Sequence, residues 1–381
     1  MRIGDFCSIN LLSYSENEKW NEIHYLDTGN ITKGKIAEVQ ILIPGSDTIP
    51  SRARRKVQVN DIIYSTVRPN QRHYGIIKEY DSQMLVSTGF VVITVDQKLA
   101  DPDFIYYFLT QDDIVETLQA IGEQSTSAYP SIKPGDIENL EIKLPSLELQ
   151  RSVGSFLRQL DEKCAANDAI NDNLQQQALA LYSSMFLENA EQQTTPGTLK
   201  DIADITMGQS PSGTSYNESG NGEVFYQGRA EFGSRFPTRR LYTTEPKRTA
   251  EAGDVLLSVR APVGDLNVAY ERCCIGRGLG AIRSKTGHRS FVLYTMFALR
   301  PQLDVFNSEG TVFGSINHNA LNDMPISVPS SEAIASFEAA VRPMDDLIRS
   351  NYEENYRLQE LRDSLLPRLM SGEVDVSDIH L

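Results

Sequence analysis

The chain has 381 residues, of which 40% are hydrophobic, and a formal net charge of −15 at pH 7. This length is enough for two or three domains with apolar cores, and the acidic balance argues against a nonspecific binder of nucleic acid. The first twenty residues carry charges throughout, and no apolar run approaches the ~20 residues of a membrane span. We therefore expect a cytoplasmic protein with no signal peptide and no membrane partner.

Residues 1–145 have the composition of a mixed, β-rich domain. β-Branched residues alternate with Gly, Pro, Asn and Asp, which predicts strands over 36–43, 61–67, 84–95 and 140–144. Apolar residues at helical spacing predict a helix over 104–121, and Asp101 just before it suits a capped start.

The spacing of apolar residues changes after Pro145, and again after Pro329, to alternating steps of three and four. Such steps are typical of a coiled coil. We expect two long helices over 146–190 and 331–381, each roughly 60 Å long at ~1.5 Å per residue. The acidic residues after 372 are expected to form a loose tail.

Four asparagines lie at matching central positions of these two helices. A polar residue in a helical seam reduces stability but fixes register and orientation. We expect an antiparallel pair in which Asn167 faces Asn355 and Asn171 faces Asn351. The alternative is that each helix packs separately on its own domain.

A polar stretch without periodicity, 188–197, ends in Pro-Gly and predicts a linker, placed at 191–197, into a second domain. That domain, 191–330, repeats the plan of the first. We expect strands over 255–259 and 268–283 and a helix over 291–297.

The two halves are also similar residue by residue. Residues 131–145 recur as 315–329 at an offset of 184, and 61–69 correspond to 254–262 at an offset of 192 to 193. Solenoid repeats are about 50 residues or shorter, so units this long are domains. Such a duplication predicts a pseudo-twofold axis, and duplex DNA is the commonest linear ligand with twofold symmetry.

No catalytic motif is recognisable. The chain contains no GxxxxGK[ST] and no HExxH, and the glycine-rich 276–280 lacks the strand–turn–helix context of a dinucleotide loop. The five histidines form no ligand pattern, and the four cysteines form no CxxC pair, which favours a reduced protein without structural zinc.

Asp136, Glu141 and Lys143 have the look of a metal-dependent nuclease core. Their counterparts in the second half are Ala320, Pro325 and Ser327. Because the trio is not repeated, ordinary surface charges are the better interpretation. We expect no catalytic residue, no metal site and no cofactor in this chain.

Four motifs, taken together and in this order, carry a resemblance to a known family. They are LPSLELQ at 144–150, DVLLSVRAPVG at 254–264, GTVFGSI at 310–316 and LLPRLMSGE at 365–373. With the duplication and the heptad helices, the chain resembles the DNA-specificity subunits of type I restriction–modification systems. One departure is that Ala128-Tyr129-Pro130 stands in the first half where the second has Phe313-Gly314.

The resemblance implies an α+β fold with two similar mixed α/β target recognition domains, 1–145 and 191–330, separated by a long antiparallel two-helix coiled coil. Each domain would read one half of a bipartite asymmetric site in double-stranded DNA. The helices would dock two methyltransferase subunits, which bind S-adenosylmethionine and methylate adenine. Up to two restriction–translocase subunits would add ATP- and Mg²⁺-dependent cleavage. The chain itself would be noncatalytic.

Basic residues are concentrated in two islands, 52–78 and 229–300, although the chain as a whole is acidic. Phosphate contacts need only such patches, and arginine or asparagine side chains can also pair with base edges. The candidates in the first domain are Arg68, Asn70, Gln71, Arg72, His73 and Lys133. Those in the second are Arg260, Arg277, Asn317 and His318, with Arg239, Arg240, Lys247 and Arg248 as phosphate contacts.

Two alternatives remain open for these residues. Each could be an ordinary surface residue, and Arg68 and Arg260 are doubtful readers because a residue shared by both halves is poorly suited to two different half-sites. The whole chain could also be a scaffold that binds proteins, although such a scaffold has no general need for basic islands.

Overall fold

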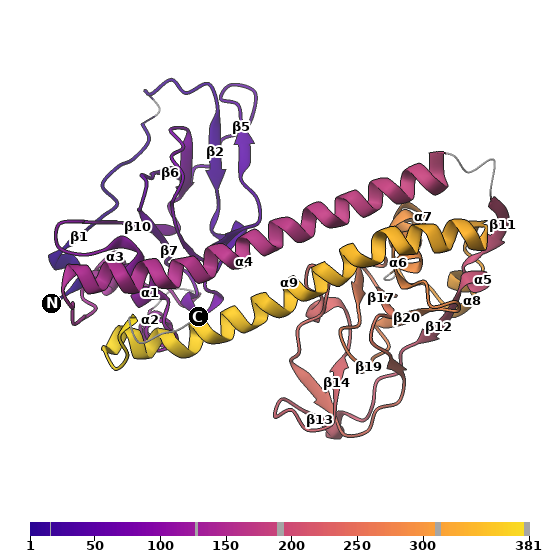
Figure 1. Cartoon of the computed structure of the whole chain (residues 1–381). Helices are drawn as coiled ribbons and strands as arrows, with labels where there is room; N and C mark the ends of the chain where they lie inside the picture. Colours follow the sequence, from indigo (N-terminus) through magenta and orange to yellow (C-terminus); the bar gives the residue numbers. More distant parts are fainter. Residues whose placement is uncertain (16, 126–128, 189–193, 309–313, 377–381) are drawn as a thin grey trace. The chain divides into compact units, whose positions relative to one another are not determined.

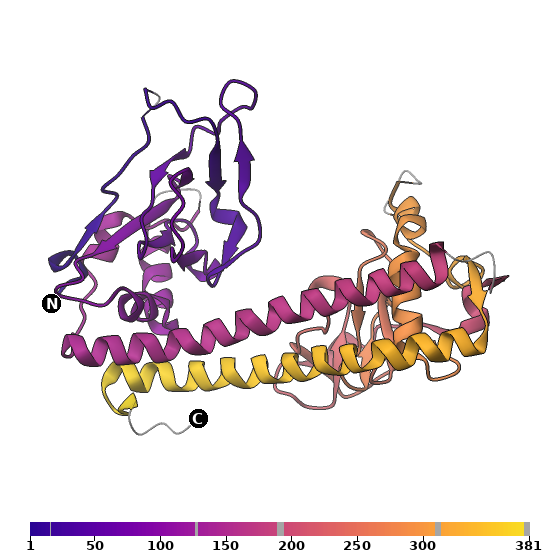
Figure 2. The same ribbon diagram turned by 45° about the horizontal axis from the view of Figure 1, so that its top comes forward.

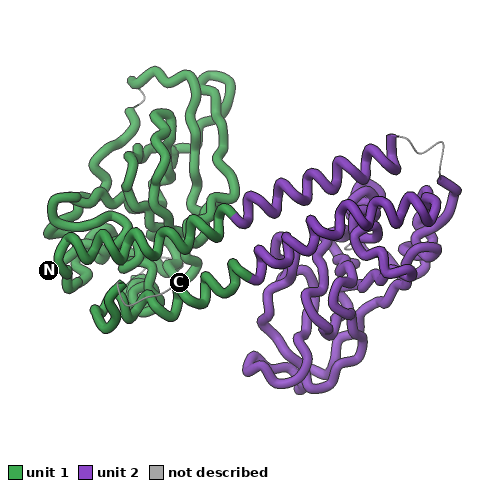
Figure 3. Tube along the Cα trace, viewed as in Figure 1, with its two compact units in different colours: residues 1–166, 354–381 green, residues 167–353 purple. Residues whose placement is uncertain are grey.

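The computed structural model describes residues 1–15, 17–125, 129–188, 194–308 and 314–376 (Figure 1). Parts of the predicted linker (191–193) and of the GTVFGSI motif (310–313), residues 126–128 and the end of the tail (377–381) lie outside the described residues. The chain divides into two compact units (Figure 3). Unit 1 comprises 1–166 and 354–381, and unit 2 comprises 167–353.

Unit 1 contains two four-stranded sheets. The first, in spatial order, is β1 (Cys7–Ile9), β10 (Phe90–Val95), β7 (Ile62–Ser65) and β8 (Tyr74–Ile76). The second is β5 (Gln40–Leu42), β2 (Ile23–Leu26), β9 (Met84–Ser87) and β6 (Ala53–Lys56). A short hairpin joins β3 (Ile31–Thr32) to β4 (Lys35–Ile36).

The central strands of unit 1 are buried on both faces, which explains their nearly continuous apolar sequence. Ile62 and Tyr64 of β7 pack into one core with the helices, whereas Ile63 between them packs into a second core with Phe90 and Val92. Alternate side chains of one strand therefore serve two cores.

The predicted helix over 104–121 has the expected capped start, but it is two helices in the structure. Asp101 accepts a hydrogen bond from the amide of Phe104 at the start of α1 (Pro102–Thr110). Extended backbone at Gln111 then separates α1 from α2 (Asp112–Glu123), where one helix is predicted. The short helices of unit 1 are η1 (Ile3–Asp5), η2 (Thr28–Asn30), η3 (Pro69–Gln71) and α3 (Pro134–Glu138).

Unit 2 repeats this topology, with one additional strand, β13, in its second sheet. Its first sheet is β12 (Ala203–Met207), β20 (Leu279–Ser284), β17 (Val255–Ser258) and β18 (Leu266–Val268). Its second is β13 (Tyr216–Asn217), β15 (Leu241–Thr243), β14 (Glu223–Tyr226), β19 (Cys273–Ile275) and β16 (Thr249–Ala250). The parallel pair β14–β19 corresponds to the parallel pair β2–β9 of unit 1.

Several predicted elements of the second half are divided or replaced. The predicted strand 268–283 is three strands, because turns interrupt it before β19 and before β20. The predicted linker 191–197 includes part of β11 (Thr194–Thr198), which pairs with β21 (Pro325–Pro329). The helices of unit 2 are α5 (Leu199–Ile202), η6 (Gly213–Ser215), η7 (Arg229–Glu231), α6 (Arg289–Ala298), α7 (Arg300–Ser308) and α8 (His318–Asn322).

Two long helices contribute segments to both units. They are α4 (Leu147–Tyr182), which continues as a π-helix over Ser183–Glu188, and α9 (Ser331–Ser371). Within unit 1, both views show the start of α4 beside the end of α9 (Figure 2). Leu157 and Leu160 of α4 share the unit 1 core with Leu365 and Leu369 of α9.

The two helix segments are antiparallel within each unit. In unit 1, the Asn355 side chain donates to the Cys164 carbonyl at 3.2 Å. In unit 2, the side-chain Nδ2 of Asn351 donates to the side-chain Oδ1 of Asn171 at 2.8 Å, which confirms this predicted asparagine pair. Asn167 and its predicted partner Asn355 are assigned to different units.

Candidate nucleic-acid interface

The loops that follow β7 and β17 carry the first candidates and have the same backbone pairing. In unit 1, Val67 forms a β-bridge with Ser131, and in unit 2 Arg260 forms the corresponding bridge with Ser315. The counterpart of Arg260 is therefore Val67.

The neighbouring amides support this register. The N–H of Arg68 donates to the Pro130 carbonyl at 2.9 Å, and the N–H of Ala261 donates to the Gly314 carbonyl at 2.8 Å. The expected equivalence of Arg68 and Arg260 is wrong, because it required a one-residue shift that the backbone does not make. The objection that a shared arginine is a poor base reader therefore no longer applies to Arg260.

One cleft of about 390 Å³ brings together four predicted contact residues of unit 2, Arg260, Arg277, Asn317 and His318. The other lining residues are Met207, Val259, Gly314, Ser315 and Ile316. The lining has two arginines and no carboxylate, in a chain whose net charge is −15. By contrast, two other clefts, one in each unit, are each lined by at least three carboxylates.

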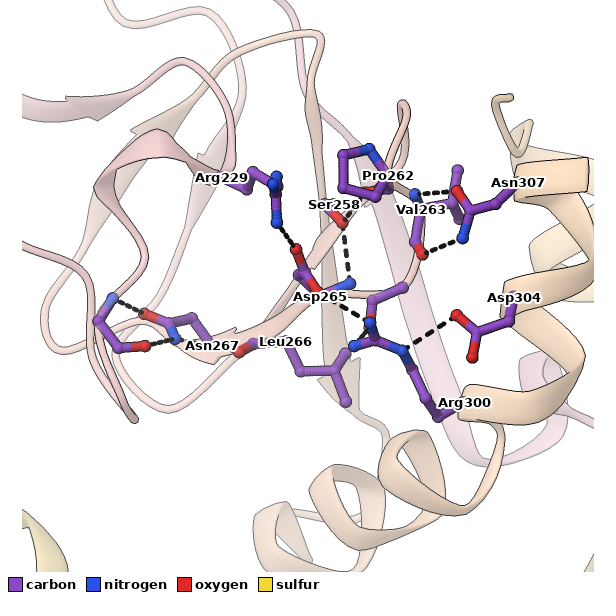
Figure 4. Close-up of polar contacts among 12 residues, drawn as sticks. Arg229, Ser258, Pro262, Val263, Asp265, Leu266, Asn267, Arg300, Asp304 and Asn307 are labelled. Carbon is purple, nitrogen blue, oxygen red and sulfur yellow. Dashed lines mark hydrogen bonds and ion pairs between the residues drawn. The ribbon is translucent and has the colours of Figure 1, made fainter. Parts of the chain in front are cut away.

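The loop that carries Arg260 is fixed by its own hydroxyl group. Ser258 Oγ donates to the Pro262 carbonyl at 2.8 Å and accepts from the Asp265 amide at 2.9 Å (Figure 4). The chain therefore folds back immediately after Arg260, whose side chain is exposed.

Two residues of α7, Arg300 and Asn307, hold the same loop from the other side. The Asn307 side chain pairs with both the N–H and the C=O of Val263, at 2.7 and 3.0 Å. Arg300 donates to the Gly264 carbonyl at 2.7 Å and to Asp265 at 2.9 Å (Figure 4). The position of Arg260 is thus defined by a hydrogen-bonded frame rather than by an open loop.

Arg277 lies in the turn between β19 and β20, flanked by Gly276 and Gly278. A Cβ atom at either glycine would lie 2.8 Å from the Gln227 carbonyl oxygen, so the turn passes too close to that backbone for any side chain. The turn is closed by the Leu279 amide, which donates to the Gly276 carbonyl at 2.9 Å. The two glycines are therefore required by the fold of this turn, and they also present Arg277.

Asn317 and His318 begin α8. The Asn317 side-chain oxygen caps the helix by accepting from the Ala320 amide at 2.9 Å, which leaves its NH₂ group available as a donor. The ring of His318 lies within hydrogen-bonding distance of Asn322, at 3.1 Å.

In unit 1, Arg68 has a left-handed backbone conformation, with φ of 49°. Its guanidinium lies over the ring of Tyr129, 4.6 Å from the ring centre, so a cation–π contact orients the side chain. Tyr129 was not among the predicted contact residues. The sequence marked it only as part of the loop that departs from the family pattern.

Asn70 and Gln71 lie on η3, beside Arg68, and both are exposed. The backbone amide of Asn70 donates to the Gln119 side chain at 3.2 Å, so α2 anchors this turn. Both residues lie at the surface of a tight turn that follows β7.

Arg72 and His73 are engaged within unit 1. Arg72 forms an ion pair with Asp112 at 2.7 Å, and Nδ1 of His73 lies 2.5 Å from the Ile31 carbonyl oxygen. Both contacts fasten the strand β8 to its neighbours. Arg72 and His73 are therefore weaker candidates for DNA contacts than Arg68.

Lys133 is exposed, and its backbone amide donates to Asp136 at 2.6 Å. Asp136 thus caps α3, and Glu141 forms a β-bridge with Arg2. The carboxylate of Asp136, one member of the apparent nuclease trio, is thus engaged as a helix cap. Among the residues that the structure describes, no group of three or more His, Cys, Asp or Glu side chains could hold a metal ion.

The four predicted phosphate contacts of unit 2 lie outside the cleft. Arg239 pairs with Glu271 at 2.5 Å and Arg240 with Glu231 at 2.6 Å. Lys247 and Arg248 are exposed and form no ion pair with a described residue. Lys247 and Arg248 are therefore the stronger phosphate candidates.

Within the described ranges, no helix is both long and apolar enough to cross a membrane.

The duplicated fold, with one carboxylate-free cleft, defines a two-domain protein of mixed α/β structure. The family described as "Type I restriction modification DNA specificity domain" matches it twice, over residues 1–176 and 192–361. The chain belongs to this family, whose members are noncatalytic specificity subunits of restriction–modification complexes.

Similar proteins carry matching descriptions. The HindI specificity subunit of a type I restriction enzyme from Haemophilus influenzae is 22% identical, over 98% of each chain. The protein named as the MjaX specificity subunit from Methanocaldococcus jannaschii is 26% identical, over 85% of this chain and 80% of that one. The crystal structure of a type I S subunit from M. genitalium has the same fold, with a TM-score of 0.58 at 15% identity, over 97% and 95% of the two chains.

Proposed function

We propose that this chain is the sequence-reading subunit of a type I complex, in which each unit reads one half of a bipartite, asymmetric site in double-stranded DNA. The observation that carries the proposal is the repetition of one topology, with the same loop register after β7 and β17, while the side chains in those loops differ. The same scaffold with different side chains is suited to two different half-sites.

The contacts follow from the placement of the exposed basic and polar residues. In unit 2, Arg260, Arg277, Asn317 and His318 of the cleft would approach base edges, and Lys247 and Arg248 would bind phosphates. Arg239 and Arg240 would bind phosphates only if their ion pairs with Glu271 and Glu231 were broken.

In unit 1, Arg68 and the exposed Asn70, Gln71 and Lys133 would contact the other half-site. Arg72 and His73 would then shape the loop, since their side chains are already engaged.

The helices α4 and α9 would form one antiparallel coiled coil that sets the distance between half-sites and docks two methyltransferase subunits. Antiparallel pairing within each unit supports this arrangement. The partner subunits would supply S-adenosylmethionine chemistry on adenine, and up to two restriction subunits would supply ATP- and Mg²⁺-dependent cleavage. The complex would act in the cytoplasm.

The proposal is tested by selecting duplexes from a random pool with the complex of this chain and its methyltransferase subunits. The expected product is a split consensus of two short elements separated by a fixed number of unspecified base pairs. Binding should also weaken steeply with salt, because phosphate contacts release counterions. A single continuous consensus, or no enrichment, would contradict the proposal.

A further inference from the structure

We propose that Arg277 reads a guanine in the major groove, in the half-site assigned to unit 2. This inference rests on the proposed function and adds the class of base that the unit 2 cleft recognises. Arg277 is exposed and lines the cleft. Its side chain forms no hydrogen bond or ion pair with a described residue, unlike Arg239 and Arg240.

The backbone around Arg277 is fixed more closely than a phosphate contact requires. The amide of Gly276 donates to the Tyr226 carbonyl at 2.8 Å, and the amide of Arg277 itself donates to Ser210 Oγ at 3.3 Å. On the other side, a Cβ atom at Gly208 would lie 2.1 Å from the Gly276 carbonyl oxygen. Base reading needs such fixed geometry, because the paired hydrogen bonds of a guanidinium to one base edge tolerate little displacement.

The chemistry of the cleft favours a ligand edge made of acceptors. Arg260 and Arg277 are donors only, and the oxygen of Asn317 is already occupied by the α8 cap. Guanine presents two adjacent acceptors, N7 and O6, in the major groove, and bidentate arginine is their commonest partner. A cytosine edge presents a donor there, and no carboxylate lines the cleft to accept from it.

Unit 1 provides an internal contrast at the same positions. The amide of Thr66 donates to the Gly89 carbonyl, as the amide of Val259 donates to that of Gly278. The residue before each of these glycines is Thr88 in unit 1 and Arg277 in unit 2.

Val67 likewise occupies the position of Arg260. Both unit 1 residues, Val67 and Thr88, are exposed and carry methyl groups in place of guanidinium groups. An arginine at this position is therefore found in unit 2 and not in unit 1. Arg277 variants should change binding to one half-site only.

The test uses the complex of the full chain with its methyltransferase subunits and a duplex carrying the split consensus that this complex selects. Each guanine of the motif is replaced in turn by 7-deazaguanine, which lacks the N7 acceptor, and binding is measured by fluorescence anisotropy. At one guanine of one half-site, the natural chain should lose affinity by less than the roughly 5- to 150-fold expected for a whole bidentate pair, because only one of its two hydrogen bonds is removed. The Arg277→Ala chain should be indifferent to the change at that guanine and keep the natural response at all others.

Two further variants separate base reading from phosphate binding. Arg277→Lys keeps the charge but loses the planar fork, so it should also lose discrimination at that guanine. Lys247→Ala, outside the cleft, should weaken binding to all sequences alike and reduce the salt dependence by about one counterion.

If Arg277→Ala weakens all duplexes uniformly, or if no guanine responds differently in that variant, Arg277 is not a guanine reader. Failure of the proposed function is distinct, because the natural chain would then define no bipartite motif at all.

Discussion

The hydroxyl of Tyr107 on α1 donates a 2.7 Å hydrogen bond to Asp161 on α4, and so ties α1 to the long helix of unit 1. Unit 2 has the same contact between Tyr294 on α6 and Asp345 on α9, at 3.1 Å. Burial, followed by the charge of the nearby aspartate, raises the pKa of Tyr107, so this phenol remains a donor. In both units, an aspartate on a long helix accepts a hydrogen bond from a tyrosine on a shorter helix of the same unit.

Each of these aspartates also pairs with an arginine, but from a different source. Arg362 of α9 contacts Asp161 at 2.6 Å, whereas Arg235, from the loop before β15, contacts Asp345 at 3.1 Å. Arg235 is the more buried, with 8% of its side chain exposed against 22% for Arg362. In both units, therefore, an aspartate of a long helix binds a tyrosine and an arginine, but the arginine is more buried in unit 2 than in unit 1.

Replacement of Asp345 by Ala should destabilise unit 2 by about 3 to 5 kcal/mol, because it leaves the guanidinium of Arg235 buried without a counterion. Asp161→Ala should cost less, about 1.5 to 3 kcal/mol in unit 1, since its arginine is better solvated. Hydrogen exchange of the α1 and α6 amides measures the two effects separately. The control is Asp346→Ala, at a carboxylate that is 72% exposed. Equal effects at Asp346 and Asp345 would rule out this role.

The asparagine pair in unit 2 should be energetically coupled. Asn351→Ala and Asn171→Ala should each lower the free energy of unfolding by about 1 kcal/mol, because each leaves a polar partner unsatisfied in the seam. The double variant should cost less than the sum of the two, by about 0.5 to 1 kcal/mol. A double-mutant cycle in urea measures this coupling. Strict additivity would mean that the 2.8 Å contact does not stabilise the helix pair.

The second sheet of unit 1 should weaken as pH rises. Both ring nitrogens of His24 lie 2.6 Å from a carboxylate oxygen, of Glu22 and of Asp81. The hydrogen bond with Glu22, and then that with Asp81, raises the pKa of His24 above its usual value near 6.5. Because the folded pKa is raised, the stabilisation is complete below that ordinary value and is lost as pH rises through the folded pKa.

Hydrogen exchange of β2 and β9 amides between pH 5.5 and 8.5, corrected for the intrinsic rate, measures this loss. His24→Gln should remove the pH dependence, and Glu22→Gln should reduce it more than Asp81→Asn, following the order of their contributions. A natural chain whose corrected protection is constant over this range would refute the role of His24.

Gly278→Ala should disturb the turn that presents Arg277. Its Cβ atom would lie 2.8 Å from the Gln227 oxygen, and an overpacked site of this kind costs about 1 to 3 kcal/mol. The matched control is Gly228→Ala in the adjacent segment, where no atom lies within 4 Å of the added carbon. Thermal unfolding should shift for the first variant and not for the second. Two equal shifts would show that the turn is less constrained than its contacts imply.

Much of the architecture followed from local pattern. The heptad spacing predicted both long helices and the Asn171–Asn351 contact, because a polar side chain in a helical seam needs a hydrogen-bond partner. The repeat predicted that both halves share one plan, which the matching sheet orders confirm. Strand boundaries were less predictable. The predicted strand 268–283 runs through two short turns, including the glycine-rich one around Arg277, and is three strands in the structure.

The candidate site was harder to predict than the fold. Four unit 2 candidates meet in one cleft because β-bridges and turns bring distant segments together. Arg72 and His73 are weaker candidates because they contact Asp112 and Ile31. Those partners are distant in the sequence, so no local motif could predict the contacts. Likewise, matching by residue type aligned Arg68 with Arg260, whereas backbone pairing aligns Val67 with Arg260.

The most direct test of the central claim is to map methylated adenine across the genome of the source cell, with and without this gene. The account predicts that one split, two-part motif is methylated only when the gene is present. It also predicts that Arg277→Ala relaxes a single position of one half of that motif. An unchanged pattern of methylation, with the partner subunits shown to be expressed, would contradict the account and leave a protein-binding scaffold as the better interpretation.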